Sequence, residues 1–307
     1  MPLPSPQQLR YLLALAVTEH FGRAAQECAV TQSTLSAGIL ALERQLDAAI
    51  LDRSAGKRVV FTPLGHDLLA RARVAMAALQ SVVETADTAR APMSGRLRLG
   101  VIPTIGPFLL PRLMPALREA FPRLQPYLRE DQTDRLLAQL AEGRLDLLLL
   151  ALPCECAGND TLPVARDEFL VALPAGHALA TQPRIQPRAL AGERLLLLED
   201  GHCLRDQALA ACGQSARPGL EDFAATSLHT LAQMVAGGLG ITLLPRMAVD
   251  AGITAGTGIV LRPLVARDAW RTIGLTWRPN APRAADFRRL APLLAASAAA
   301  AGDAVIE

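Results

Sequence analysis

The chain has 307 residues, 31 of them basic and 29 acidic, and its formal net charge is +2 at pH 7 with neutral histidines. This length allows two or three domains, and the nearly balanced charge neither requires nor excludes a nucleic-acid partner. With no secretory signal, no uncharged apolar stretch of membrane-spanning length and too few cysteines (five) for a secreted disulfide framework, we expect a cytoplasmic protein without a membrane partner.

Residues 1–62 have the pattern of a winged helix-turn-helix domain. Apolar residues recur at helical spacing in three successive segments, at 7–19, 23–29 and about 32–46, with a turn at 30–31. The third segment carries Gln32, Ser33 and Ser36 on the face opposite its apolar stripe. Such a helix pair is typical of proteins that read double-stranded DNA in the major groove, so we expect these three side chains to face base edges.

A basic turn at residues 52–58 lies between two short apolar segments. We predict a two-stranded wing whose Arg53, Lys57 and Arg58 contact phosphates. Residues 1–62 hold six basic and five acidic side chains, a net charge of +1. This charge is small for a DNA-binding domain, so useful affinity would require several subunits on DNA at once.

A long helix without internal proline is predicted over residues 63–92. Thr62-Pro63 is a favourable helix start, and Pro92 to Gly95 ends the helix and forms a hinge. Apolar residues fall near heptad positions, namely Leu68, Leu69, Ala72, Ala75, Met76, Leu79 and Val83. Such a stripe needs a partner, and a second copy of the chain is the simplest one.

From residue 96 onward strand-like and helical segments alternate, which predicts an α/β domain with a mainly parallel sheet. Strands are expected at 97–102, 145–152, 169–173, 195–198, 241–244 and 273–277, and helices at 109–121, 133–140, 227–236 and 285–299. The wholly apolar run 147–152 is typical of a strand covered on both faces. We expect no cofactor and no metal. Cys154 and Cys156 form a Cys-x-Cys pair, which is only a weak metal or redox signal, and we expect them on the solvent side.

The most informative segment contains two cysteines nine positions apart, Cys203 and Cys212. Cys203 follows His202 and lies two positions before Arg205, and cationic neighbours hold a thiol as the thiolate that oxidants attack. A second cysteine can convert the resulting sulfenic acid to a disulfide. The pair is therefore a candidate redox switch. Two ordinary buried thiols are the alternative that residue types alone leave open.

The spacing of this pair adds a conformational element. The segment between the two cysteines has good helix formers and neither Gly nor Pro, so we predict a helix. On an ideal helix nine residues rise about 13 Å. A disulfide needs Cα atoms within about 7 Å, so bond formation would require the helix to refold.

With these elements in place, the chain resembles the LysR-type transcriptional regulators, and within them the peroxide-sensing OxyR subgroup. The family resemblance rests on the motifs at residues 23–25, 30–36, 39–46 and 62–65. The subgroup resemblance rests on residues 99–107, 198–208, 225–228, 240–245 and 271–274. One departure is Asp222, where relatives in this subgroup often have histidine.

The resemblance implies a regulatory domain at 96–307 with two subdomains like those of periplasmic binding proteins. The first would hold about 96–166 and 267–307, and the second about 167–266. Cys203 would be the peroxidatic cysteine and Cys212 the resolving one, while Thr104 and Thr133 would position hydrogen peroxide. The residues expected to polarise the site are His202, Arg205 and Arg271. Both threonines could equally cap the helices that follow them.

The resemblance further implies a homotetramer, a dimer of dimers, that binds promoter DNA and activates or represses. RNA polymerase would be a further partner, and the glutaredoxin or thioredoxin system would reduce the disulfide. A regulator that senses a small metabolite between its subdomains is the alternative within the family. A thiol peroxidase is the alternative outside it, and would leave the winged helix without a use. The sequence therefore predicts a peroxide-responsive transcription factor rather than an enzyme.

Overall fold

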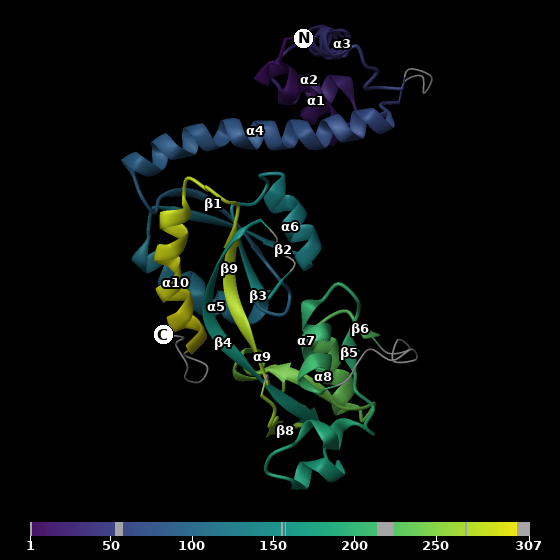
Figure 1. Ribbon diagram of the computed structural model, residues 1–307, viewed down its shortest axis with the longest axis vertical. Coiled ribbons are helices and arrows are strands. Elements are labelled where there is room, and N and C mark those ends of the chain that lie inside the picture. Colours follow the sequence, from purple (N-terminus) through teal and green to yellow (C-terminus); the bar gives the residue numbers. More distant parts are fainter. Residues whose placement is uncertain are drawn as a thin grey trace. The chain divides into compact units, whose positions relative to one another are not determined.

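The structure is a computed structural model that describes residues 2–52, 58–154, 156, 158–213, 224–267 and 269–299. The chain divides into two compact units. The first runs to Asp87 and takes in Ala141–Arg144, and the second holds Thr88–Leu140 and the chain from Leu145 onward. Figure 1 shows the helices and strands of each unit.

Three short helices form the body of the first unit: α1 (Pro6–Thr18), α2 (Phe21–Glu27) and α3 (Gln32–Leu46). Each begins at a cap, because the side chains of Ser5, His20 and Thr31 accept hydrogen bonds from N–H groups of the first turn. The His20 cap makes α2 begin at Phe21, two residues earlier than its apolar pattern indicates. The three predicted helices and the turn before the third are confirmed.

A minimal wing follows α3. Leu51 and Phe61 form an isolated antiparallel bridge, and the buried Glu43 carboxylate accepts hydrogen bonds from the N–H groups of Ile50 and Leu51. Arg58 is exposed beside the bridge. The predicted phosphate contacts Arg53 and Lys57 lie outside the described residues, as does Asp222.

The predicted long helix is α4 (Pro63–Arg90), continuous over 28 residues. Its Leu69 and Ala72 pack into the core of the first unit. No helix among the described residues is long and apolar enough to cross a membrane.

The second unit is a mixed sheet with helices around it. Its strands are β1 (Gly95–Val101), β2 (Leu124–Glu130), β3 (Leu147–Leu152), β4 (Asp160–Leu173), β5 (Leu197–Leu198), β6 (Ala224–Ala225), β7 (Thr242–Pro245), β8 (Val260–Pro263) and β9 (Trp270–Trp277). Its helices are α5 (Gly106–Ala120), α6 (Thr133–Ala141), α7 (Cys203–Ala211), α8 (Leu228–Ala236), α9 (Arg246–Asp250) and α10 (Ala284–Ala299), with short 3₁₀ turns at Ala178–Thr181 and Pro187–Leu190. The predicted α/β class is confirmed.

The prediction of a mainly parallel sheet is wrong. The main sheet has the order β2-β1-β3-β9-β4-β7, and β8 also pairs with β4. β1 is parallel to β2 and β3, but the pairs β3–β9, β9–β4, β4–β7 and β4–β8 are antiparallel. The sheet is mixed because β4 and β9, the longest strands described, run antiparallel to each other through the middle of the sheet (Figure 1).

β4 joins two lobes by changing its partners near its middle. Asp160–Glu168 pair with β9, whereas Phe169 onward pairs with β7 and β8. This change of partner lies close to residue 166, where the first segment of the first predicted subdomain ends. The sequence pattern did not indicate β2, because this edge strand is mostly exposed and lacks a regular apolar alternation.

The core of the second unit centres on β3, where Leu147, Leu148, Leu149 and Leu150 are fully buried. The prediction of a strand covered on both faces is therefore confirmed. The expected solvent-side position of Cys154 and Cys156 is wrong. The two are joined as a disulfide, and the chain after β3 packs both against the core, with Cys156 buried.

We expect Leu149→Ala to lower the free energy of unfolding of the second unit by about 2–5 kcal/mol, because the truncation leaves a cavity in a close-packed strand. Leu128→Ala, at a 44% exposed position of edge strand β2, is the matched control and should cost less than about 0.5 kcal/mol. Denaturant titration followed by tryptophan fluorescence measures this unit specifically, because both tryptophans lie in β9. Equal losses in the two variants would contradict the assignment of the core.

Candidate functional site

The two central cysteines lie at opposite ends of one helix. Cys203 is the first residue of α7 and is half-buried, whereas Cys212 is the C-terminal cap and is buried. Both thiols are free. The predicted helix between them is confirmed, so the separation of about 13 Å along the axis applies to this structure.

The groups that act on the Cys203 thiol come from three separate elements. Burial raises the pKa of Cys203 above its ordinary value. The Arg271 charge, a hydrogen bond from the Thr133 side chain and the N–H groups of Cys203 and Leu204 act in the opposite direction. These are the donors that a thiolate, or an oxygen leaving beside it, would require.

A buried guanidinium connects this site to the loop after β1. Arg271 Nη1 donates to Thr104 Oγ1 at 2.9 Å, and Nη2 donates to the Thr104 carbonyl at 2.8 Å. Both residues are 2% exposed. Helix α5 begins after Ile105, which makes no side-chain cap hydrogen bond. The alternative reading of Thr104 as a helix cap is therefore wrong, because the cap position of α5 is Ile105.

The loop after β2 meets the loop before α7. Gln132 Nε2 donates to the Asp200 carbonyl at 3.4 Å. Gly201 has φ of +90°, and a Cβ there would come within 2.9 Å of the Gln132 side chain. The glycine therefore permits the approach that brings Thr133 to Cys203.

Two residues expected to polarise Cys203 have other roles. Arg205 forms an ion pair with Asp200 at 2.9 Å and donates to the Leu198 carbonyl, so its charge is directed away from the thiol. Burial lowers the pKa of His202, and Glu199 only partly opposes this. His202 is therefore mostly neutral at pH 7. The expectation that these two cations hold the thiolate is corrected: the cation acting on Cys203 is Arg271.

The structure adds two residues that the sequence reasoning missed. Asp167 is buried and binds Arg271, with Oδ2 3.0 Å from Nε. Gln207 lies one helical turn after Cys203, and its Oε1 is buried without a hydrogen-bond partner. Gln207 is four residues after Cys203, and this spacing on a predicted helix could have indicated that the two side chains lie on the same face. No sequence signal could have paired Asp167 with a residue 104 positions away.

The second thiol is kept unreactive by its surroundings. Burial raises the pKa of Cys212 to about 11. At neutral pH the group is a thiol and not a nucleophilic thiolate. Among the described residues no cluster of three His, Cys, Asp or Glu side chains could hold a metal ion.

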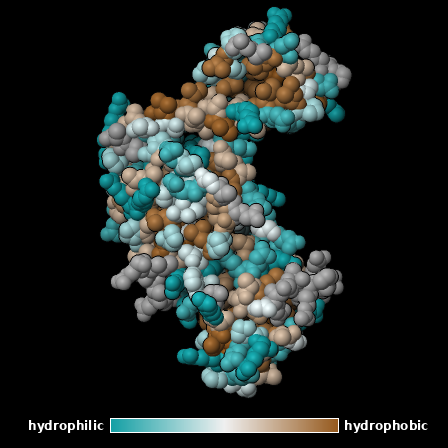
Figure 2. Space-filling view, viewed as in Figure 1, coloured by the Kyte–Doolittle hydropathy of each residue, from teal (hydrophilic) through white to brown (hydrophobic). Residues whose placement is uncertain are grey.

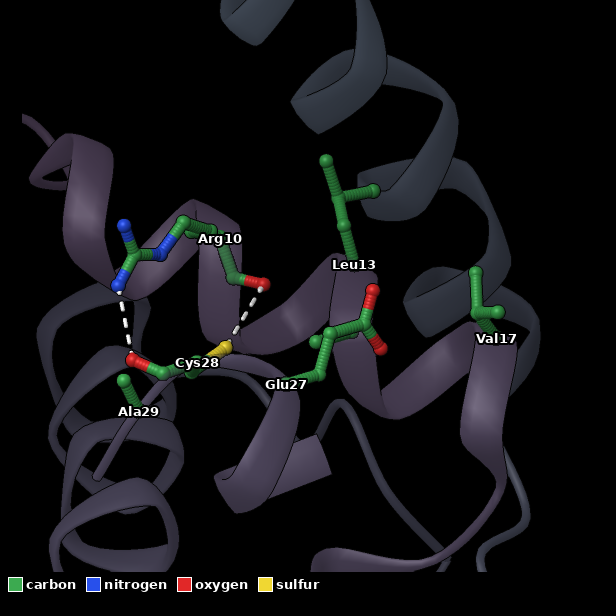
Figure 3. Close-up of a pocket in the computed structure, with 7 residues that line it drawn as sticks. Arg10, Leu13, Val17, Glu27, Cys28 and Ala29 are labelled. Carbon is green, nitrogen blue, oxygen red and sulfur yellow. Dashed lines mark hydrogen bonds between the residues drawn. The ribbon is translucent and has the colours of Figure 1, made fainter. Parts of the chain in front are cut away.

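The first unit presents a polar helix face. Gln32, Ser33 and Ser36 are exposed on α3, while Leu35 and Ile39 are buried beneath them. A pocket of this unit lies between α1 and the end of α2 (Figure 3). There the Arg10 guanidinium donates to the Cys28 carbonyl at 3.0 Å, and the Cys28 sulfur faces the Arg10 carbonyl at 4.0 Å. Cys28 is thus a buried packing residue that caps α2.

Comparisons with known proteins match both units. Residues 6–66 match the bacterial regulatory helix-turn-helix protein model of the lysR family, and residues 90–299 match the LysR substrate binding domain. The chain is 42% identical over 290 residues to the DNA-binding transcriptional dual regulator OxyR of Escherichia coli (strain K12), with 94% of each covered.

Solved structures agree with this result. A full-length OxyR variant from Pseudomonas aeruginosa has a TM-score of 0.77 at 36% identity, over 97% of this chain and 96% of that chain. An H2O2-bound cysteine-to-serine variant of Corynebacterium glutamicum OxyR has a TM-score of 0.65 at 34% identity, over 98% and 96%.

We expect the alkylation rate of Cys203 to rise with pH and to have its midpoint above that of an unstructured peptide thiol, because burial raises its pKa. Thr133→Val should lower the rate at pH 8 by about tenfold, since the thiolate loses a charge-assisted hydrogen bond. The measurement is mass spectrometry of the Cys203 peptide after timed reaction with iodoacetamide. Thr161→Val, at an exposed position of β4, is the control, and an effect of equal size there would contradict the role of Thr133.

Proposed function

The chain belongs to the LysR family of transcriptional regulators and is a homologue of OxyR, and from this premise we propose that it senses hydrogen peroxide through Cys203 and Cys212. One observation carries the proposal. Thr133 and Arg271 converge on Cys203 at the start of α7, while Cys212 lies at the far end of the same helix. A half-buried thiol among oriented donors suits the capture of a small, uncharged oxidant.

The first chemical step is the oxidation of Cys203. Cys203 first releases its proton, and the thiolate attacks one oxygen of H2O2. The O–O bond breaks, and the departing hydroxide takes up the released proton and leaves as water. Thr104 and Thr133 would orient the peroxide, and Arg271 would stabilise the negative charge that moves from sulfur to the departing oxygen. The product is a sulfenic acid at Cys203.

The second step couples chemistry to conformation. The Cys212 thiol replaces the sulfenic hydroxyl, which leaves as a second water, and a disulfide forms. The helical separation of about 13 Å exceeds the range of about 7 Å that a disulfide allows, so α7 must unwind. Unwinding also removes Cys212 from the surroundings that hold its pKa near 11. The oxidised chain therefore differs from the reduced one in backbone as well as in covalent structure.

The DNA-binding role rests on α3 and on self-association. Gln32, Ser33 and Ser36 would read base edges and Arg58 would contact phosphate. α4 exposes Val74, Leu79, Val82 and Val83, and Figure 2 shows hydrophobic side chains along it. A second copy would cover these residues, and a dimer of such dimers would place four weakly charged DNA-binding units on one promoter.

The remaining partners follow from the same scheme. A reducing cytoplasm would hold the two thiols free, and the glutaredoxin or thioredoxin system would reverse the disulfide. RNA polymerase would respond to the altered promoter complex. The chain would react stoichiometrically with peroxide and not as a peroxidase.

We expect one equivalent of H2O2 to produce a Cys203–Cys212 disulfide and to change the DNase footprint on promoter DNA. Mass spectrometry of the full chain maps the bond. Cys203→Ser should abolish both effects, and Cys212→Ser should stop at the sulfenic acid. Cys28→Ser, at a buried thiol of the other unit, is the matched control and should behave like the unchanged chain.

Two outcomes would contradict this function. A Cys203→Ser variant with an intact promoter response would favour a metabolite-sensing regulator. Multiple turnovers of peroxide with thioredoxin or glutaredoxin, at a rate unrelated to DNA binding, would favour a thiol peroxidase.

We expect Gln32→Ala to weaken specific DNA binding by about 1–3 kcal/mol with loss of sequence preference, because it removes a base-edge contact. Arg58→Ala should weaken binding to all sequences and lower the salt slope by about 1. Fluorescence anisotropy at several salt concentrations measures both effects. Gln80→Ala, at an exposed position of α4, is the control. A loss with Gln32→Ala that is the same for specific and random DNA would contradict base reading.

A further inference from the structure

Asp167 lies at the point where the two long strands of the second unit pair. It is the register partner of Arg271, on β4 and β9 respectively, and the two side chains are 4% and 2% exposed. Asp167 Oδ2 is 3.0 Å from Arg271 Nε and 2.9 Å from Nη2. A carboxylate so deeply buried is stable only with such a partner.

The other carboxylate oxygen is also held. Asp167 Oδ1 accepts a hydrogen bond of 2.9 Å from the Met247 N–H at the start of α9. With both oxygens engaged, the carboxylate has a fixed position, and so has the guanidinium bound to it. The remaining Arg271 donors are directed at Thr104, on the side of the peroxide site.

On this basis, and resting on the proposed function, we propose that Asp167 is a positioning residue of the peroxide reaction. It holds the Arg271 guanidinium against Thr104, and its negative charge limits how much of the Arg271 charge reaches the thiol. The carboxylate therefore has two opposing effects. It orients the Arg271 guanidinium, and it weakens the electrostatic effect of that guanidinium on the Cys203 sulfur.

The charged groups on the α9 side of the pair are Arg246 and Asp250 on α9, Glu168 on β4 and Arg112 on α5. Those next to Cys203 at the start of α7 are Glu199, Asp200, His202 and Arg205. Arg246 is engaged by the exposed Glu168 at 3.1 Å, and Arg205 by the exposed Asp200 at 2.9 Å. Burial is the main cause of the raised pKa of Asp250, Arg246 and Arg112 act in the opposite direction, and the Asp167 charge adds to the rise. Asp167 is the carboxylate bonded to the cation that acts on Cys203.

Asp167→Asn separates the two effects. The amide keeps the size of the side chain and one acceptor but removes the negative charge. The full Arg271 charge would then act on Cys203, so its pKa would fall. We expect the alkylation of Cys203 by iodoacetamide at pH 7 to be about 3- to 10-fold faster, with the pH midpoint shifted downward.

The peroxide reaction should respond differently. It needs the guanidinium in place beside Thr104 as well as a thiolate, and the amide holds Arg271 less firmly. The ratio of the peroxide rate to the alkylation rate should therefore fall by about threefold or more. A residue with a purely structural role would not change this ratio.

Asp146→Asn is the matched control. Asp146 is also a buried aspartate, 6% exposed, and pairs with Arg98 at the other end of the sheet. It should affect stability but leave the pH profile and the rate ratio of Cys203 unchanged. Tryptophan fluorescence of the full chain checks that each variant is folded.

Should Asp167→Asn fail to fold, Asp167→Glu makes the same test, because it keeps the charge and displaces it by one methylene. We then expect an alkylation profile near that of the unchanged chain and a slower peroxide reaction. Unaltered alkylation and peroxide rates in either folded variant would overturn the role of Asp167. That result, with a Cys203–Cys212 disulfide still formed in the unchanged chain, would leave the proposed function standing.

Discussion

The buried guanidinium of Arg271 is the interaction on which the second unit most depends. A charge removed from water is costly unless its donors are satisfied, and Asp167 and Thr104 accept from all three of its nitrogens. Removing one partner of such a pair typically costs about 3–5 kcal/mol. The same hydrogen bonds tie β4 and β9 to the loop after β1. The hydrogen bonds that hold this part of the fold together therefore also set the electrostatics of Cys203.

The second constraint is the helical order of α7. Its backbone hydrogen bonds keep Cys203 and Cys212 at opposite ends, and burial keeps Cys212 protonated. Both effects favour the reduced chain. In the proposed function, oxidation would add a covalent bond that the helix cannot accommodate, so the disulfide and the helical backbone would oppose each other. In the proposed function this opposition makes a small oxidant produce a large conformational change. It also provides for reversal, because reduction allows the helix to form again.

In the proposed function, the DNA-binding unit would depend on polar surface residues and on association between subunits, and not on a buried ion pair. Its specificity would rest on a few polar side chains over a well-packed helical core, while its net charge over residues 1–62 is only +1. A weak single unit suits a regulator whose binding depends on how several units are spaced. The exposed apolar residues of α4 are the natural place for that association. In the proposed scheme, affinity then depends on the geometry of the assembly, which the regulatory unit can alter.

Local patterns in the sequence determined the helices of the first unit, the long α4, the helix between Cys203 and Cys212 and the motifs of the family. These features depend on periodicity and capping within a few turns, so neighbouring residues encode them. The direction of β4 and β9, the edge strand β2 and the pairing of Asp167 with Arg271 depended on the tertiary structure. Strand pairing and buried ion pairs join residues that are far apart in the chain. The charge of a side chain does not reveal which residue it will pair with. For that reason the neighbours of Cys203 in sequence indicated His202 and Arg205 as the cations that act on it, and Arg271 was expected only from the family resemblance. In the folded chain the cation that acts on Cys203 is Arg271.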